Sequence, residues 1–183
     1  MTNPVAEPRP GTLLIAPPSQ DADAVFARSV VLVFDREPNG ITAGLVINRS
    51  LAQPAMESSA LTLRFLPNPN AQAFWGGPMG DDPAILAQFS AIDGLEFFHL
   101  PIRRPRPFVL PDVGLIAVAE HTEPFEGRIR RARLFVGMCV WDRGQLEAEL
   151  EIDAWLTVAP PTIEDLFSPA PEALWTELLA RTH

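Results

Sequence analysis

Residues 136–150 of this 183-residue chain read VGMCVWDRGQLEAEL. The apolar residues 134–140 predict a buried β-strand that ends at Trp141. The residues that follow alternate between polar and apolar with a helical period, and they predict a helix that begins at Gly144. A strand that passes at a tryptophan into a helix is therefore the local feature on which the predicted fold rests.

The predicted helix carries its own start and packing signals. Asp142 is a good N-cap, and Gln145 follows it three residues later, as in a capping box. Leu146 and Leu150 are one turn apart and form the expected inward face. Two glutamates are expected to face water, Glu147 and Glu151.

Apolar runs elsewhere in the chain predict more β-structure. Residues 29–34 (SVVLVF) are continuously apolar, as in a strand buried on both faces. An Asn39-Gly40 turn leads into residues 41–47, so residues 29–47 predict a β-hairpin. Further strands are expected at residues 11–16, 73–75, 84–89, 95–100, 115–119 and 154–158. Short helices or helical turns are expected at residues 21–28, 58–65, 125–131, 162–167 and 171–180.

Length and composition predict one globular domain. Residues 1–10 contain three prolines and charged side chains, which indicates a flexible N-terminal tail rather than a signal peptide, and residues 11–183 form the domain. No apolar run approaches the roughly 18 residues that a membrane span needs. We therefore expect a cytoplasmic protein without a membrane partner.

The net charge of −9 argues against a general nucleic-acid binder, so we expect no tight DNA binding. The charge is uneven along the chain. Residues 103–133 hold seven arginines and four acidic residues, whereas residues 142–183 hold nine acidic residues and two arginines. These segments are either ordinary solvated surface or two complementary faces, within one molecule or between subunits.

The chain shows no recognised catalytic constellation. Cys139 is the only cysteine and the three histidines are scattered, which predicts no metal site and no disulfide. Cys139 lies within an apolar strand and Ser29 at a strand start, where both residue types usually pack. We therefore expect no enzyme activity and no cofactor.

Two sets of residues remain candidates for a functional site. A candidate pocket or functional surface is formed by Ser29, Asn48, Gly76, Gly77, Pro78, Trp141, Gly144, Gln145, Glu147 and Glu149. Candidate phosphate contacts are Arg103, Arg104, Arg106, Arg128, Arg130, Arg131 and Arg133.

Four motifs in this order resemble the YqgE/AlgH family of bacterial proteins, over residues 11–181. They are DxxFxRSVV at 23–31, GLVINR at 44–49, GGP at 76–78 and WxxGQLExE at 141–149, with Trp155 beyond them. The last motif is highly specific. Residues 166–169 (LFSP) with Trp175 resemble the ending of actinobacterial members.

The resemblance implies a single-domain α+β fold with a complex mixed β-sheet, bifurcated and partly barrel-like, and helices packed outside it. This chain departs from the family pattern at residues 138–140 (MCV), where members usually have Tyr, a small residue and Gly. A site that depends on that tyrosine hydroxyl is therefore not implied here. The hairpin is one residue longer than usual, which predicts a β-bulge.

The resemblance implies a regulatory role, because some members are called transcriptional regulators, but it implies no reaction. The leading interpretation is a non-enzymatic cytosolic protein that binds an unidentified protein or small molecule and has a transcription-related regulatory role. One alternative is a ligand-binding protein or enzyme with a pocket near Asn48, residues 76–78 and residues 141–145. The other is direct nucleic-acid binding through the arginines at 103–106 and 128–133. Assembly into a homo-oligomer stays open.

The corner at residues 141–150 generates a stability prediction. Leu150→Ala should lower the free energy of unfolding by about 2–5 kcal/mol, because it truncates a buried side chain. Asp142→Ala should cost about 0.5–2 kcal/mol if Asp142 caps the helix, and Glu149→Gln should cost almost nothing if Glu149 is solvated. Thermal melts measure all three, and a Leu150→Ala variant that melts like the parent would show that the helix is misplaced.

Overall fold

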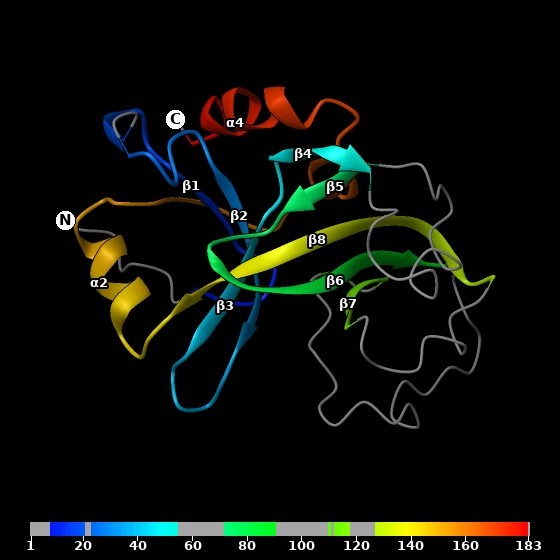
Figure 1. The fold of residues 1–183 in the computed structure, drawn as a ribbon. Coiled ribbons are helices and arrows are strands. Elements are labelled where there is room, and N and C mark those ends of the chain that lie inside the picture. Colours follow the sequence, from blue (N-terminus) through cyan, green and yellow to red (C-terminus); the bar gives the residue numbers. More distant parts are fainter. Residues whose placement is uncertain are drawn as a thin grey trace.

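The longest strand, β8 (Ile129–Trp141), pairs with three other strands and connects the two ends of the molecule (Figure 1). The structure is a computed structural model that describes residues 8–20, 23–54, 72–90, 110, 112–117 and 127–182. The other strands are β1 (Leu13–Ile15), β2 (Val30–Arg36), β3 (Thr42–Val46), β4 (Ser50–Pro54), β5 (Gln72–Trp75), β6 (Met79–Phe89), β7 (Val113–Ala117) and β9 (Leu156–Val158). The helices are the 3-10 turn η1 (Pro18–Gln20), α2 (Gln145–Glu151), α3 (Ile163–Leu166) and α4 (Pro171–Leu179).

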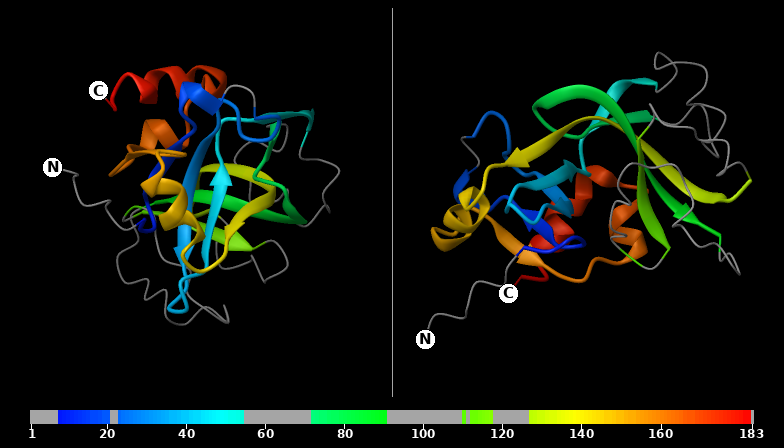
Figure 2. Two further views of the ribbon diagram at one scale, coloured as in Figure 1. Left: turned by 90° about the vertical axis from the view of Figure 1, so that its left-hand side faces the viewer. Right: turned by 90° about the horizontal axis from the view of Figure 1, so that it is seen from below.

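The sheet is mixed, which confirms the expected α+β class. Hydrogen-bonded pairing links the strands in the order β4-β5-β8-β3-β2-β1-β9. In addition, β8 pairs with β6, and β6 pairs with β7. The β5–β8 pair is parallel, and the other pairs are antiparallel. Helix α2 lies at one end of the molecule, and β6 and β7 extend toward the other (Figure 2).

One edge of β8 pairs with two different strands. Its residues 139–141 pair with β3, whereas residues 135–136 pair with β5. The opposite edge pairs with β6 over most of its length. The sheet therefore forks beside residues 137–138, as the resemblance implied.

Strand alternation divides the apolar residues between two main cores. Leu32 points into a core shared by β1, β2, β3, β6, β7 and β8 with the helices α3 and α4. Val31 and Val33 point to the other face, where they pack with Trp141, Trp155 and the leucines of α2. Residues 29–33 are fully buried, which confirms the prediction of a strand buried on both faces.

The helices are short and held by specific contacts. Thr162 and Asp165 form a reciprocal capping box at the start of α3. In α4, Leu174 and Leu178 are buried, and the indole N–H of Trp175 donates to the carbonyl of Ala16 at 2.7 Å. None of the helices in the described part of the chain has the length and apolar character needed to cross a membrane.

Most of the expected elements are present. The β2–β3 hairpin is confirmed, and it contains a β-bulge, which lies in β2 between Val33 and Asp35 and not within residues 40–44, where the extra residue had suggested it. Strands also occur near residues 11–16, 73–75, 84–89, 115–119 and 154–158. The expected helix at 58–65 and the strand at 95–100 lie outside the described residues. The same holds for residues 1–7 of the expected tail, whereas Arg9 and Thr12 bond to each other in a turn.

Two expectations for β8 were wrong. The helical turn predicted at 125–131 is instead, from Ile129 onward, the start of this strand, because pairing with β6 overrides the weak local signal. The segment 134–140 is not buried throughout, because alternation leaves Val140 39% exposed. A continuous apolar run does not distinguish these two environments.

The fork depends on glycines that pack backbone against backbone. A Cβ at Gly76 would lie 2.2 Å from the carbonyl oxygen of Gly137, and one at Gly77 would lie 2.3 Å from the carbonyl carbon of Met138. Gly137 has a φ of 75°, which favours glycine. The Gly-Gly-Pro motif is thus a site of close chain approach.

Gly76→Ala should therefore destabilise the protein by about 3 kcal/mol or more, since overpacking against rigid backbone has no easy relief. Gly80→Ala is the matched control, because its Cβ would enter open space and only the positive φ of 70° would cost about 1 kcal/mol. Urea unfolding of both variants measures the difference. Equal losses would show that the close approach is not needed.

Candidate functional site

The carboxylate of Glu149 gathers the side chains at the end of β8. Its Oε2 accepts the indole N–H of Trp141 at 2.9 Å and that of Trp155 at 2.8 Å. Its Oε1 accepts the side-chain amide of Gln145 at 2.9 Å. The Gln145 Oε1 in turn accepts the backbone N–H of Asp142 at 3.1 Å. One carboxylate thus orients two tryptophans and a glutamine.

Local geometry brings these residues together. Trp141 is the last residue of β8, and Gln145 and Glu149 are four residues apart on one face of α2. Trp155 lies just before β9, and its ring meets that of Trp141 edge to face at 6.2 Å. Leu146 and Leu150 are buried under the helix, as predicted.

The expected capping box is only half formed. Gln145 reaches back to the backbone of Asp142, but the N-cap residue of α2 is Gly144, in a left-handed conformation, and no side chain caps the helix. The prediction that Asp142 caps α2 was therefore wrong. Asp142 lies two residues before this N-cap, too far from the first helical N–H groups to cap them.

Two glutamates differ from their expected setting. Glu149 is half-buried and accepts three hydrogen bonds, so the condition that it is solvated does not hold. Glu147 does not simply face water, because it pairs with Arg36 at 2.5 Å and its Oε2 is buried without a hydrogen-bond partner among the described residues. Glu151 is exposed, as expected.

A pocket of about 310 Å³ lies beside this network. It is lined by Gln20, Asp23, Phe26, Glu149, Ala154 and Trp155. Phe26 meets Trp155 edge to face at 5.6 Å, and the amide of Gln20 donates to the carbonyl of Ala154 at 2.9 Å. The pocket therefore joins the segment before β2 to the end of α2, with aromatic rings and two carboxylates in its wall.

Asp23 is fixed by the turn that it begins. Its Oδ1 accepts the backbone N–H groups of Val25 at 2.6 Å and Phe26 at 2.9 Å. These hydrogen bonds lower the pKa of Asp23, so the carboxyl stays ionised at neutral pH. The same bonds hold Phe26 against Trp155.

Ser29 and Asn48 form a separate structural unit. Asn48 accepts the N–H of Val30 at 2.8 Å and donates to the carbonyl of Arg28 at 2.9 Å, so it braces the chain on both sides of Ser29. Ser29 is fully buried, and its Oγ has no hydrogen-bond partner in the described structure. Neither residue lines the pocket.

Most of the sequence-predicted pocket residues thus do not line the pocket. Trp141, Gln145 and Glu149 come together, and only Glu149 is in the wall. Gly76 and Gly77 are buried at the fork, whereas Pro78 and Gly144 are exposed. Asp23, Phe26 and Trp155 were missed as site residues although they belong to the recognised motifs. Gln20 and Ala154 had no sequence signal.

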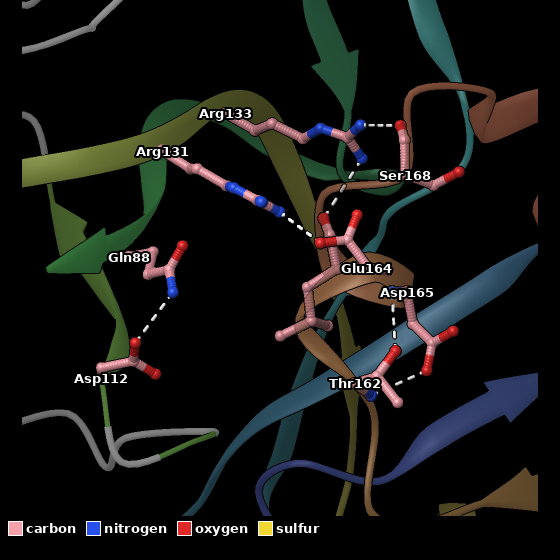
Figure 3. Close-up of polar contacts among 9 residues, drawn as sticks. Gln88, Asp112, Arg131, Arg133, Thr162, Glu164, Asp165 and Ser168 are labelled. Carbon is pink, nitrogen blue, oxygen red and sulfur yellow. Dashed lines mark hydrogen bonds and ion pairs between the residues drawn. The ribbon is translucent and has the colours of Figure 1, made fainter.

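Two of the described arginines of the second candidate set, Arg131 and Arg133, are engaged with residues near and in α3 (Figure 3). Arg133 donates to the carbonyls of Leu166 and Ser168 and lies 4.6 Å over the ring of Phe74. Burial lowers the pKa of Arg133 to about 10. Arg131 pairs with Glu164 of α3 at 2.9 Å.

Other members of this set have different settings. Arg128 and Arg130 are exposed, and Arg103, Arg104 and Arg106 lie outside the described residues. The Arg131–Glu164 pair shows that part of the basic segment faces the acidic C-terminal region within one molecule.

The described residues contain no group of three or more His, Cys, Asp and Glu side chains that could hold a metal ion. Cys139 is buried, and its Sγ lies 3.6 Å from the carbonyl oxygen of Gly76. Burial raises the pKa of the Cys139 thiol to about 12, although nearby Arg49 acts in the opposite direction. The structure thus places Cys139 at the fork as a packed, protonated thiol.

Glu149→Gln should lower the free energy of unfolding by about 1–3 kcal/mol. The new amide oxygen can accept both indoles, but its NH₂ then faces the NH₂ of Gln145, and turning Gln145 moves the conflict to the Asp142 N–H. Glu151→Gln removes the same charge from an exposed position on α2 and should change stability by less than about 0.5 kcal/mol. Thermal melts compare them, and equal melting temperatures would contradict the network.

Cys139 should resist alkylation in the folded protein. At pH 8 a thiol with a pKa of about 12 is roughly a thousand times less ionised than an unfolded cysteine, and only the thiolate reacts. Iodoacetamide labelling, followed by mass spectrometry with and without urea, measures the ratio. Complete labelling of the native protein within minutes would contradict this environment.

The chain is similar to known proteins along nearly its whole length. The family model described as AlgH-like (DUF179) matches residues 13–183. A UPF0301 protein of Thermobifida fusca is 35% identical over 181 residues, which cover 93% of this chain and 85% of the relative. A UPF0301 protein of Streptomyces avermitilis is 33% identical over 175 residues, with the same shares covered.

Two solved structures have the same fold. The crystal structure of protein DIP2367 from Corynebacterium diphtheriae has a TM-score of 0.80 at 23% identity and covers 99% of this chain and 90% of its own. The solution structure of AlgH from Pseudomonas aeruginosa has a TM-score of 0.66 at 24% identity, with 99% and 92% covered. At these identities the likeness shows the fold alone. With its motifs, its fold and its relatives in agreement, the chain belongs to the AlgH-like family, whose specific function is not established.

Proposed function

We propose that this protein is a non-enzymatic binding protein whose ligand or partner group enters the pocket beside Glu149. The observation that carries this proposal is the Glu149 carboxylate in the pocket wall, held by Trp141, Trp155 and Gln145. Binding sites commonly combine an apolar wall with a few fixed polar groups. Any regulatory effect would then follow from occupation of this pocket.

The setting of the reactive residues supports binding over catalysis. The hydroxyl of Ser29 and the thiol of Cys139 are both buried, and the thiol is protonated at neutral pH. Glu149 accepts three hydrogen bonds, which hold its carboxylate in one orientation. A residue in this state suits recognition of a fixed group better than proton transfer.

A regulatory role through direct DNA contact has less support. The net charge is −9, and the arginines at 131 and 133 are already engaged with α3 and the residues after it. Backbone contacts to DNA need accessible cations that release counterions. A regulator of this kind would act through a protein or a small molecule.

A protein-detected NMR screen tests the proposal. The probes are small cationic, neutral and anionic fragments, and the signals are the four indole N–H groups. Bound fragments should shift the Trp155 and Trp141 signals, which belong to the core beside the pocket, and leave that of Trp175, which packs against the other core, unchanged. Shifts that map elsewhere, or no binding by any class, would overturn the proposal.

A pair of variants makes the screen specific. Ala154→Phe fills the pocket and should abolish binding, since Ala154 is in its wall. Ala148→Phe places the same ring on the exposed side of α2 and should leave binding intact. Binding that survives Ala154→Phe would move the site away from this pocket.

We also predict no retardation of duplex DNA at about 150 mM salt and micromolar protein, because phosphate contacts are strongly screened there. Arg128→Ala and Arg130→Ala, both at exposed positions, should leave the fold intact. A gel-shift assay measures the binding. Nanomolar, sequence-specific binding that persists in both variants would contradict the prediction.

A further inference from the structure

We infer that the pocket beside Glu149 recognises an alkylammonium group, that is, a protonated primary amine on an aliphatic stem. The inference rests on the proposed function, because it specifies the ligand of the same site. Three properties of the pocket support it: two carboxylates that form no ion pair with any described residue, two aromatic rings, and a small volume.

The first property is uncompensated negative charge. Glu149 receives its three hydrogen bonds from uncharged groups, and within the described part of the chain no cationic side chain forms an ion pair with it. Two other acidic residues differ, because Glu147 pairs with Arg36 and Asp165 with Arg181. A half-buried carboxylate without a counter-charge attracts a cation more strongly than a solvated one does.

Asp23 adds a second carboxylate to the same wall. Its Oδ1 is used by the turn at Val25 and Phe26, which leaves Oδ2 as an acceptor toward a ligand. Arg49 acts on it electrostatically and contributes to lowering its pKa. However, the Arg49 guanidinium donates to the carbonyl of Ala27 at 2.9 Å and lies 5.1 Å over the ring of Trp75, so it does not neutralise Asp23 by direct pairing.

The second property is the pair of rings formed by Phe26 and Trp155. Aromatic faces attract ammonium groups, and tryptophan does so best. The Trp155 N–H donates to the Glu149 carboxylate, which polarises the indole and increases the electron density of its face. The rings also offer apolar surface for the methylene stem of the amine.

The third property is the small volume of the pocket, which, together with its lining residues, favours an amine over a metal ion or an anion. At about 310 Å³ the pocket is at the small end of ligand sites, so it suits an ammonium group with a short chain. A bare metal ion would need more oxygen ligands than the two carboxylates provide, and the described residues form no larger cluster of metal-binding side chains. Among the described residues that line the pocket there is no arginine or histidine, and the two charged side chains, Asp23 and Glu149, would repel an anion.

The test compares three probes of equal length, n-butylammonium chloride, 1-butanol and sodium butyrate, by titration of the indole N–H signals of Trp141 and Trp155. Butylammonium should bind at least about ten times more tightly than the other two, because a charge-assisted hydrogen bond contributes at least that factor. Equal binding by butanol or butyrate would overturn the inference but leave the pocket as a binding site. The proposed function fails separately, when no fragment of any class reaches the pocket.

Charge-neutralising variants locate the interaction. Asp23→Asn keeps the oxygen that caps Val25 and Phe26 and should weaken butylammonium binding about ten-fold. Glu149→Gln should weaken it at least as much. Glu151→Gln removes an equal charge from an exposed site and should have no effect. A similar loss in Glu151→Gln and Asp23→Asn would indicate general attraction to an acidic surface and would overturn the inference.

A second pair of probes distinguishes the source of the amine. 1,4-Diaminobutane represents a free small amine, and Nα-acetyl-lysine N-methylamide represents a lysine side chain within a protein. Binding of the first alone indicates a small-molecule ligand, and binding of both indicates that a partner's lysine also fits. Failure of both, together with butylammonium, would overturn the inference.

Discussion

The close backbone contact between Gly77 and Gly137 allows β8 to pair with strands in both parts of the forked sheet. A side chain at either position would enter the other chain, since a Cβ on Gly137 would lie 2.4 Å from the carbonyl oxygen of Gly77. With no side chain between them, β3 and β5 both reach the same edge of β8. The fork then determines where β8 ends, and thereby where Trp141 and α2 lie.

The position of α2 makes the Glu149 network possible. Leu146 and Leu150 seat the helix on the face formed by Val31, Val33 and Val46, so Glu149 is carried to the rim of that core. There its carboxylate meets two indole N–H groups that would otherwise be left without partners near an apolar core. The network therefore completes the packing and at the same time holds a charge beside a pocket. Under the proposed function, one side chain combines a structural role with a binding role.

The polar contacts on the opposite side of the molecule have a different consequence. Arg131 and Arg133 connect β8 to α3 and to the residues after it, with the guanidinium of Arg133 over Phe74 (Figure 3). These bonds hold the C-terminal helices on the main core. Arg131 and Arg133, which suggest phosphate binding in the sequence, thus stabilise the packing of the C-terminal segment on β8. The acidic residues near α2 keep their negative charge.

The sequence by itself determined the strands at residues 29–34 and 41–47, the helix after Trp141 and the family, because period, turn residues and motifs are local properties. It did not determine the start of β8, since pairing with β6 decides that segment. Nor did it determine the role of Glu149 or the wall of the pocket. Gln20 and Ala154, which are 134 residues apart in the chain, meet only after the sheet has formed. Which side chains surround a carboxylate, and whether a cation pairs with it, depends on such long-range contacts and is decided by the tertiary structure alone.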